Sequence, residues 1–451
     1  MERRTRIWIG LGAAILVSGT EGGPSAFAVV RPTEPAGVPD GVSQHGPSTS
    51  GTLLAQSEGA GFEGGEGGEG EGGEGGGQVL GTISEFRLSS TDPDAFAYDG
   101  SKQVATYAAL VHERYAAAHA GAVALQDAVT ALLADPGETT LEAARAAWLN
   151  ARPAYVQTQA FLFYGGPVDA PGGPIKRLAS WPIDEAFLDY VEGNPQSGIV
   201  NDPSIELTRA NIVRLDQAAA PSDVTTGWHA IEFLLWGQDL STVGPGTRPY
   251  ADYVAGVGNN DRRREYLRIV TRLLVNDLST LVAAWAPDMN NYRASILAMD
   301  QRNAIGRAFN GMAVLTGYEM GLRRLSAGLF APGGDHEESR FSDNTSSDFA
   351  AGLRGARDVY FGSASGAGHA GFDALVAELD PALDDRVVAA FDTAERSIAA
   401  LDVPYDGILA SPPGSPARAE GRAAVIALTD LAAALRAAGN RLGVLVVVPG
   451  I

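Results

Sequence analysis

The stretch KQVATYAALVHERYAAAHAGAVALQDAVTALLAD, residues 102–135, decides the fold. Its apolar side chains recur at steps of three and four residues, which is the spacing of one face of an α-helix. Pro136-Gly137 follows directly and ends the pattern. We therefore expect a long amphipathic helix whose packed face carries Val104, Tyr107, Val111, Tyr115, Ala118, Ala122, Leu125, Val129 and Leu132.

The chain beyond this stretch repeats the helical pattern. Thr139 and Glu142 have the spacing of a capping box, and the helix they predict runs through Trp148 towards Tyr164. Pro153 is expected to kink or divide that helix, because proline cannot donate a backbone hydrogen bond. Further helices are expected over 205–215, 223–236, 262–285, 292–329, 348–360, 383–401 and 416–442.

Strand signals are scarce, and the mostly β-branched run 444–448 is short. The sequence therefore predicts an all-α protein built from helical bundles. The helical region has about 350 residues, which exceeds the size at which a single core stops growing. We expect two bundles with a cleft between them, the first over 97–246 and the second over 247–451.

The N-terminus has the three parts of a secretory signal peptide. Arg3, Arg4 and Arg6 precede an apolar run at 7–17, and Ala26-Phe27-Ala28 fits a signal-peptidase site. We expect cleavage after Ala28 and export to the periplasm or the exterior of the cell envelope, with an uncleaved membrane anchor as the alternative. No later stretch is expected to span a membrane.

A polar tether is expected over residues 29–96. Glu58–Gly77 is almost entirely glycine and glutamate, and such a composition cannot form a core. The tether is read as a flexible spacer, with weak trapping of hard cations as the alternative.

The overall composition excludes several function classes. The 54 acidic residues against 33 basic ones give a net charge of −21, which makes nucleic acid an unsuitable partner. The chain has no cysteine, so disulfides, thiolate metal sites, iron–sulfur clusters and cysteine nucleophiles are excluded.

His229 and Glu232 are the chemically most informative pair. They lie in the run GWHAIEFLLWG, residues 227–237, and residues three apart project from the same helical face. Imidazole and carboxylate together suit zinc, manganese or iron. A satisfied structural pair is the alternative, and the second histidine of the zinc-protease pattern His-Glu-x-x-His is missing, so further ligands would have to converge.

This run and three others resemble the imelysin family, whose members are also described as insulin-cleaving metallopeptidase-like or iron-regulated exported proteins. Gly227, His229 and Glu232 match its Gly-x-His-x-x-Glu signature. Similar matches are WPIDE at 181–185, ESRFSDNT at 338–345 and the Trp–Arg–Tyr helix at 148–164. The resemblance covers roughly residues 97–445. It implies two helical bundles with a site between them near the histidine and glutamate.

The resemblance also implies a role, which differs among members: some are classed as metallopeptidases, and others are linked to iron uptake. This chain departs from the family at Gln159, where an acidic residue is common. A glutamine keeps a ligand oxygen but loses the charge, so a metal site at this position would carry one negative charge fewer than the family's.

Other polar residues are candidates for the same cleft. Asp184 and Glu185 follow Trp181-Pro182, although acids also favour a helix N-terminus. Glu319 lies between two glycines and is expected to pair with Arg323, four residues on. The remaining candidates, for which capping within the loop 333–345 is the alternative, are Glu338, Ser339 and Asp343.

We therefore expect an exported imelysin-like protein that binds a metal, or a small metal-linked ligand, in its cleft, with a role in iron or metal acquisition. The expected cofactor is a divalent or ferric ion, iron or zinc, held by His229 and Glu232. A transporter or receptor would be the partner. The alternatives are a zinc-type metallopeptidase, whose catalytic residues the sequence does not assign, and a non-catalytic scaffold.

Overall fold

The computed structural model describes residues 85–331, 336–363, 370–401 and 404–451. Within these ranges the protein is helical and has no β-strand, only one isolated bridge between Val191 and Asn194. The first elements are α1 (Ser101–Ala134), α2 (Glu138–Val156), η1 (Gln157–Phe161), α3 (Ile175–Ala179), α4 (Glu185–Leu188), α5 (Arg209–Leu215), α6 (Gly227–Trp236), η2 (Tyr250–Tyr253), α7 (Asn260–Trp285) and α8 (Tyr292–Ala298). The later ones are α9 (Gln301–Ala313), η3 (Val314–Ser326), α10 (Ala327–Phe330), α11 (Thr345–Phe361), α12 (Phe372–Leu379), α13 (Pro381–Ala399), α14 (Tyr405–Ala410) and α15 (Pro416–Arg441).

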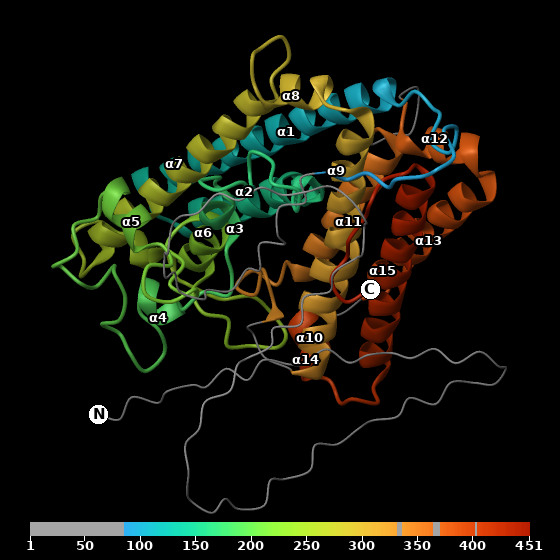
Figure 1. Cartoon of the computed structure of the whole chain (residues 1–451). Coiled ribbons are helices and arrows are strands. Elements are labelled where there is room, and N and C mark those ends of the chain that lie inside the picture. The colour runs from blue at the N-terminus through green and yellow to red at the C-terminus, as the bar shows by residue number, and fades with distance from the viewer. Residues whose placement is uncertain (1–84, 332–335, 364–369, 402–403) are drawn as a thin grey trace, which may run out of the picture. The chain divides into compact units, whose positions relative to one another are not determined.

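The first bundle is built on α1, which packs against α2 and α7, as Figure 1 shows. All nine apolar positions predicted for the packed face of α1 are buried. Helix α6 packs against α2 and α7 and is buried at every residue. Because α7 belongs to this group, the first bundle continues past residue 247.

The second bundle consists mainly of α9, η3, α11, α13 and α15. Helix α15 packs against η3, α13 and α9, and α11 packs against both bundles through α2, η1, α13 and η3. The predicted all-α fold with two helical bundles is confirmed. Their junction is formed by α2, η1 and α6 on one side and by η3, α11 and the loop 336–344 on the other.

Several predicted helix boundaries are wrong. The predicted capping box of Thr139 and Glu142 does not form, because the N-cap of α2 is Gly137, two residues before Thr139, and the backbone N–H of Gly137 donates to the hydroxyl of Thr140. Pro153 remains inside α2, which continues as the 3-10 helix η1. The helices predicted from 205 and 223 begin at Arg209 and Gly227.

The helix predicted over 292–329 is divided into four pieces. Its first break precedes α9, where Asp300 accepts a hydrogen bond from the N–H of Arg302 and starts a new helix. Val314–Ser326 is a π-helix, a widened turn that often occurs at functional positions. The run 444–448 forms no strand, and its Val444, Val446 and Val448 side chains are buried in the core.

The predicted tether, residues 29–96, extends too far, because its last residues contact the helical bundles. Phe86 is buried, and its backbone N–H donates to the side chain of Asn303. The N–H of Leu88 donates to the carbonyl of Gly443. This segment docks because one large aromatic side chain provides the anchor that the Gly/Glu composition lacks. The predicted signal peptide and the run Glu58–Gly77 lie outside the described residues.

Two helices, α1 and α15, are long and apolar enough to cross a bilayer by length and composition alone. The sequence alone predicts no such segment beyond the signal peptide. Both helices bury their apolar faces in the bundles. Many of their other residues are alanines, which raise the mean hydropathy without forming a large apolar surface.

Candidate functional site

Helix α6 delivers His229 and Glu232 to the junction of the two bundles. The helix begins at Gly227, whose φ of +82° is a left-handed conformation that favours glycine. A Cβ atom there would lie 2.3 Å from the carbonyl oxygen of Leu178. The glycine of the signature therefore allows the chain to turn tightly into a helix that is buried at every residue.

His229 and Glu232 meet as their spacing predicts. The Nδ1 atom of His229 lies 2.9 Å from Oε2 of Glu232. The other oxygen of Glu232 accepts two hydrogen bonds from Ser342, from its N–H at 3.0 Å and its hydroxyl at 2.7 Å. Both members of the pair are at most 1% exposed. The pair is thus tied to the loop that leads into α11.

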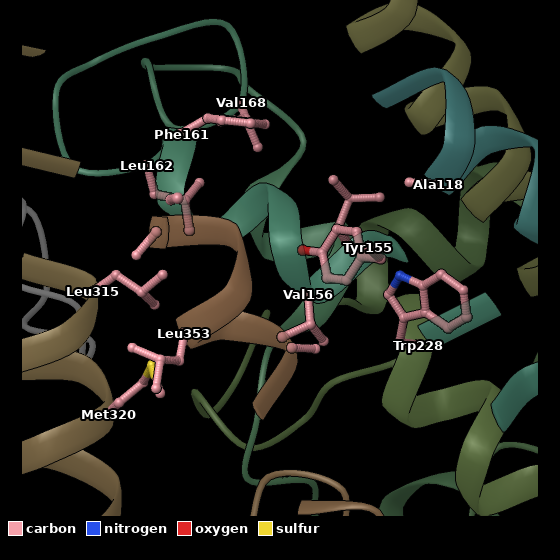
Figure 2. Packing of buried hydrophobic residues seen from close by; sticks show 14 of the residues in the cluster. Ala118, Tyr155, Val156, Phe161, Leu162, Val168, Trp228, Leu315, Met320 and Leu353 are labelled. Carbon is pink, nitrogen blue, oxygen red and sulfur yellow. The ribbon is translucent and has the colours of Figure 1, made fainter. Parts of the chain in front are cut away.

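Arg152 of α2 occupies the other side of the imidazole. Its Nη2 lies 3.4 Å from Nε2 of His229 and donates to Glu338 at 2.8 Å and to Asp348 at 2.9 Å. The guanidinium lies 5.5–6.0 Å from the ring centroids of Trp148, Tyr155 and Trp228. Figure 2 shows the rings of Tyr155 and Trp228 at this junction. These aromatic faces stabilise a cation that is fully buried.

Glu338 connects this arginine to a second one. Its Oε2 lies 2.5 Å from Nη1 of Arg324, which belongs to the π-helix η3. Its Oε1 lies 3.7 Å from Nε2 of His229 and accepts from the amide of Gln159 at 3.4 Å. Arg324 in turn donates to the amide oxygen of Gln159 at 3.5 Å. Gln159 therefore bridges an acid and a base instead of adding a charge.

The electrostatic environment fixes the charges of this centre. Burial opposes the charged form of Glu338, but Arg324 and Arg152 outweigh burial and hold the pKa of its carboxyl well below the usual range. Burial and Arg152 lower the pKa of His229, whereas its hydrogen bonds to Glu232 and Glu338 raise it, and the net direction is upward. The arginines therefore act as resident cations for the buried acids.

Three residues of the centre are not among the sequence candidates: Arg152, Arg324 and Asp348. Asp348 accepts from Arg152, from the hydroxyl of Ser339 at 2.6 Å and from the amide of Asn344 at 2.9 Å. Arg152 does carry a sequence signal, because it lies on the apolar face of α2 between Trp148 and Tyr155. A buried arginine requires acids as partners.

The structure separates the other candidates from His229. Glu319 pairs with Arg323 at 2.7 Å, as the spacing predicts. Asp184 is exposed at the start of α4. Glu185 accepts from Gln238 and forms an ion pair with Arg340 at 3.1 Å. Among the described contacts, neither of these two acids reaches the histidine.

Asp343 belongs to a second group of acids. One carboxylate oxygen each from Asp239, Asp343 and Asp406 lies within 4.8 Å of the others. Burial and the charges of Asp406 and Asp239 raise the pKa of Asp343 to about 6. Burial and the charges of Asp406 and Asp343 raise the pKa of the adjacent Glu337 to about 8. We call these four residues the acidic cluster.

A pocket of about 560 Å³ opens on the surface next to both groups. Ser342, the partner of Glu232, lines it together with Trp236 and Arg145. Ser241, whose N–H donates to Asp239, also lines it. Solvent therefore approaches the loop around residue 342 from this side.

The fold and the junction define a two-bundle helical protein with a buried histidine–glutamate–arginine centre. The chain belongs to the imelysin family, also called peptidase family M75, whose sequence profile matches residues 111–437. It is similar to iron-regulated protein A of Synechococcus elongatus, with 27% identity over 326 residues, 70% of this chain and 80% of that protein.

Two solved structures share the fold. One is described as an iron-regulated protein A precursor from Parabacteroides distasonis, with a TM-score of 0.60 and 20% identity over 76% of this chain and 96% of that one. The other is an imelysin-like protein from Psychrobacter arcticum, with a TM-score of 0.51 and 16% identity over 78% and 98% of the two chains.

Proposed function

We propose that this protein is an exported metal-binding member of the imelysin family, acting in iron acquisition. One observation carries the metal site: Nε2 of His229 and Oε1 of Glu338 lie 3.7 Å apart, although they come from segments 109 residues apart in sequence. Two ligand atoms of one first-row ion lie roughly 3–3.4 Å apart, given metal–ligand distances of about 2.0–2.2 Å. A small approach of these atoms would form the core of a coordination sphere.

The donor set fits such an ion once Arg152 moves. His229 supplies nitrogen and Glu338 supplies carboxylate oxygen, a mixture that suits iron, zinc or manganese. Gln159 would add its amide oxygen after its side-chain amide turns over, because its nitrogen now faces Glu338 and its oxygen faces Arg324. Glu232 would keep its present contacts and would not bind the ion itself, because its carboxylate already contacts Nδ1 of His229 and accepts from the N–H and the hydroxyl of Ser342. It would orient the imidazole in the way that carboxylates orient metal-binding histidines.

Arg152 is the competitor in this proposal. Its Nη2 contacts both His229 and Glu338, so an ion and this guanidinium cannot use the same two atoms together. Metal binding would therefore exchange one cation for another. The buried acids keep a positive partner in both states, which limits the electrostatic cost of an empty site.

The geometry favours binding over peptide hydrolysis. A zinc peptidase needs an open coordination position for water and access for an extended peptide. His229, Glu232, Glu338 and Arg152 are at most 3% exposed. The name of the Synechococcus relative supports the link to iron, and the N-terminal signal pattern supports export. A membrane transporter or receptor would then receive the bound ion.

Calorimetric titration of Fe(II), Fe(III), Zn(II) and Mn(II) tests the proposal. We expect one site in the wild type that is lost in His229→Ala and Glu338→Gln and retained in Glu378→Gln, an exposed acid of α12. Melting each variant without metal separates folding from binding. If His229→Ala and Glu338→Gln bind metal as tightly as the wild type but melt at lower temperatures, these residues have a structural role and do not bind metal. Metal-dependent peptide cleavage would instead support the peptidase.

A further inference from the structure

We call His229, Glu232, Glu338 and Arg152 the histidine centre. The acidic cluster lies beside this centre but consists of acids alone. Asp239 follows α6, Asp343 lies in the loop before α11 and Asp406 is in the first turn of α14. These segments are distant in sequence, yet one oxygen from each falls within 4.8 Å of the others. The fold thus brings three like charges together from two bundles.

The cluster contains buried oxygens without hydrogen-bond partners among the described residues. They are Oδ1 of Asp343, Oδ2 of Asp406 and Oε1 of Glu337. Glu337 is 3% exposed, and the three aspartates act on its charge. A buried acceptor without a partner is costly, and native proteins usually satisfy such groups with protein, water or an ion. This arrangement therefore indicates a bound species that is coordinated by oxygen atoms.

Among the described residues, no arginine or lysine forms an ion pair with these acids. The charge of Arg340 lowers the pKa of both Asp239 and Glu337, but the guanidinium forms an ion pair with Glu185 and with neither of these two acids. The histidine centre differs in this respect, because Arg152 and Arg324 contact its acids directly. The cluster thus keeps an excess of negative charge in a partly buried place.

We propose that Asp239, Asp343 and Asp406 bind a hard divalent cation, with calcium preferred over magnesium, at a site separate from the histidine centre. All available donors are oxygens, which suit such ions. Calcium–oxygen distances of about 2.3–2.6 Å give a coordination sphere roughly 4.6–5.2 Å across, and the three oxygens already fit inside it. Magnesium, at about 2.0–2.1 Å, has a smaller coordination sphere, roughly 4.0–4.2 Å across. Glu337 is not one of the three proposed ligands, but the charges of all three aspartates act on its buried carboxyl group.

Calcium at this site would also stabilise the neighbouring centre. Asp343 follows Ser342, whose N–H and hydroxyl both bind Glu232. An ion held by Asp343 and by Asp406 of α14 would fix this loop between the two bundles. The site would therefore hold the orienting group of His229 in place without contacting the histidine.

The full chain, freed of metal with a chelator, tests the proposal. We expect calorimetry with calcium chloride to show one site whose affinity falls by more than about tenfold in Asp343→Asn and in Asp406→Asn, since even outer-shell changes commonly cost about 10–100-fold. Asp385→Asn, which removes an exposed acid of α13, is the matched control and should bind like the wild type. Magnesium and manganese chloride are titrated in parallel.

Thermal melting provides a second readout in case a variant folds poorly. Removing one like charge should leave the metal-free melting temperature unchanged or higher, while the calcium-dependent rise disappears. No calcium binding, or equal binding in Asp343→Asn and Asp385→Asn, would overturn the site. Preference for magnesium would overturn the calcium assignment. Glu338→Gln should retain calcium binding, so failure of the iron proposal and failure of this one are distinguishable.

Discussion

Replacing Arg152 by methionine tests whether the buried charge network holds the two bundles together. Methionine keeps much of the side-chain length but removes the charge and all donors. Arg152 is fully buried and donates to Glu338 at 2.8 Å and to Asp348 at 2.9 and 3.1 Å. Removing one partner of a buried ion pair costs about 3–5 kcal/mol, because it leaves the other charge unpaired.

The remaining contacts place the expected loss near the lower end of that range. Glu338 keeps Arg324, and Asp348 keeps Ser339 and Asn344. We therefore expect about 3 kcal/mol. With about 2–4 °C per kcal/mol for domains of 150–250 residues, the melting temperature should fall by roughly 6–12 °C, or somewhat less in this longer chain.

Urea denaturation and calorimetric melting of the metal-free protein measure this loss. Arg386→Met, at an exposed position of α13, is the control and should change stability by less than about 0.5 kcal/mol. The double variant Arg152→Met with Asp348→Asn should lose less unfolding free energy than the two single variants lose together, by about 0.5–3 kcal/mol. A loss for Arg152→Met no larger than that of the control, or strict additivity, would refute the network.

Three further predictions concern other parts of the molecule. Gly227→Ala should destabilise the protein by more than about 2 kcal/mol in urea denaturation, because the alanine adds left-handed strain and a clash with the carbonyl of Leu178; an unchanged midpoint would contradict this. Because the folded pKa of Glu337 is raised to about 8, the contribution of Glu337 to metal-free stability should be fully present below the unfolded value near 4.5 and be lost as pH rises towards 8. In Glu337→Gln that decline should weaken, and an identical pH profile would refute it. Limited proteolysis should leave a resistant core that begins near Phe86, and cleavage inside 86–96 would contradict the docking of this segment.

The fold could be predicted because helical periodicity is a local signal. In α1 the spacing of the apolar residues identifies the individual residues of the buried face. Helix breaks depend on weaker and competing signals. Asp300 starts α9 by accepting one hydrogen bond, and the apolar pattern on either side conceals this break.

Only part of the candidate site is local in the same sense. His229 and Glu232 share a helical face, so their spacing predicts the hydrogen bond that forms. Arg152 reaches His229 from 77 residues away and Asp348 from 196 residues away. Such pairings depend on how α2, α6 and α11 pack, and periodicity within one helix carries no information about that.

The structure divides what the sequence treats as one cleft into two environments with different charge balance. Glu338 lies among Arg152, Arg324 and Gln159, and its charge is compensated by residues of the chain. Asp343, five residues later, faces other acids instead. Both lie on the same short loop, so movement of that loop would affect both. An ion that fixes Asp343 would also fix Ser342 and the carboxylate of Glu232. The two environments are therefore expected to be coupled, with the acidic cluster setting the geometry of the histidine centre through one hydrogen-bonded serine.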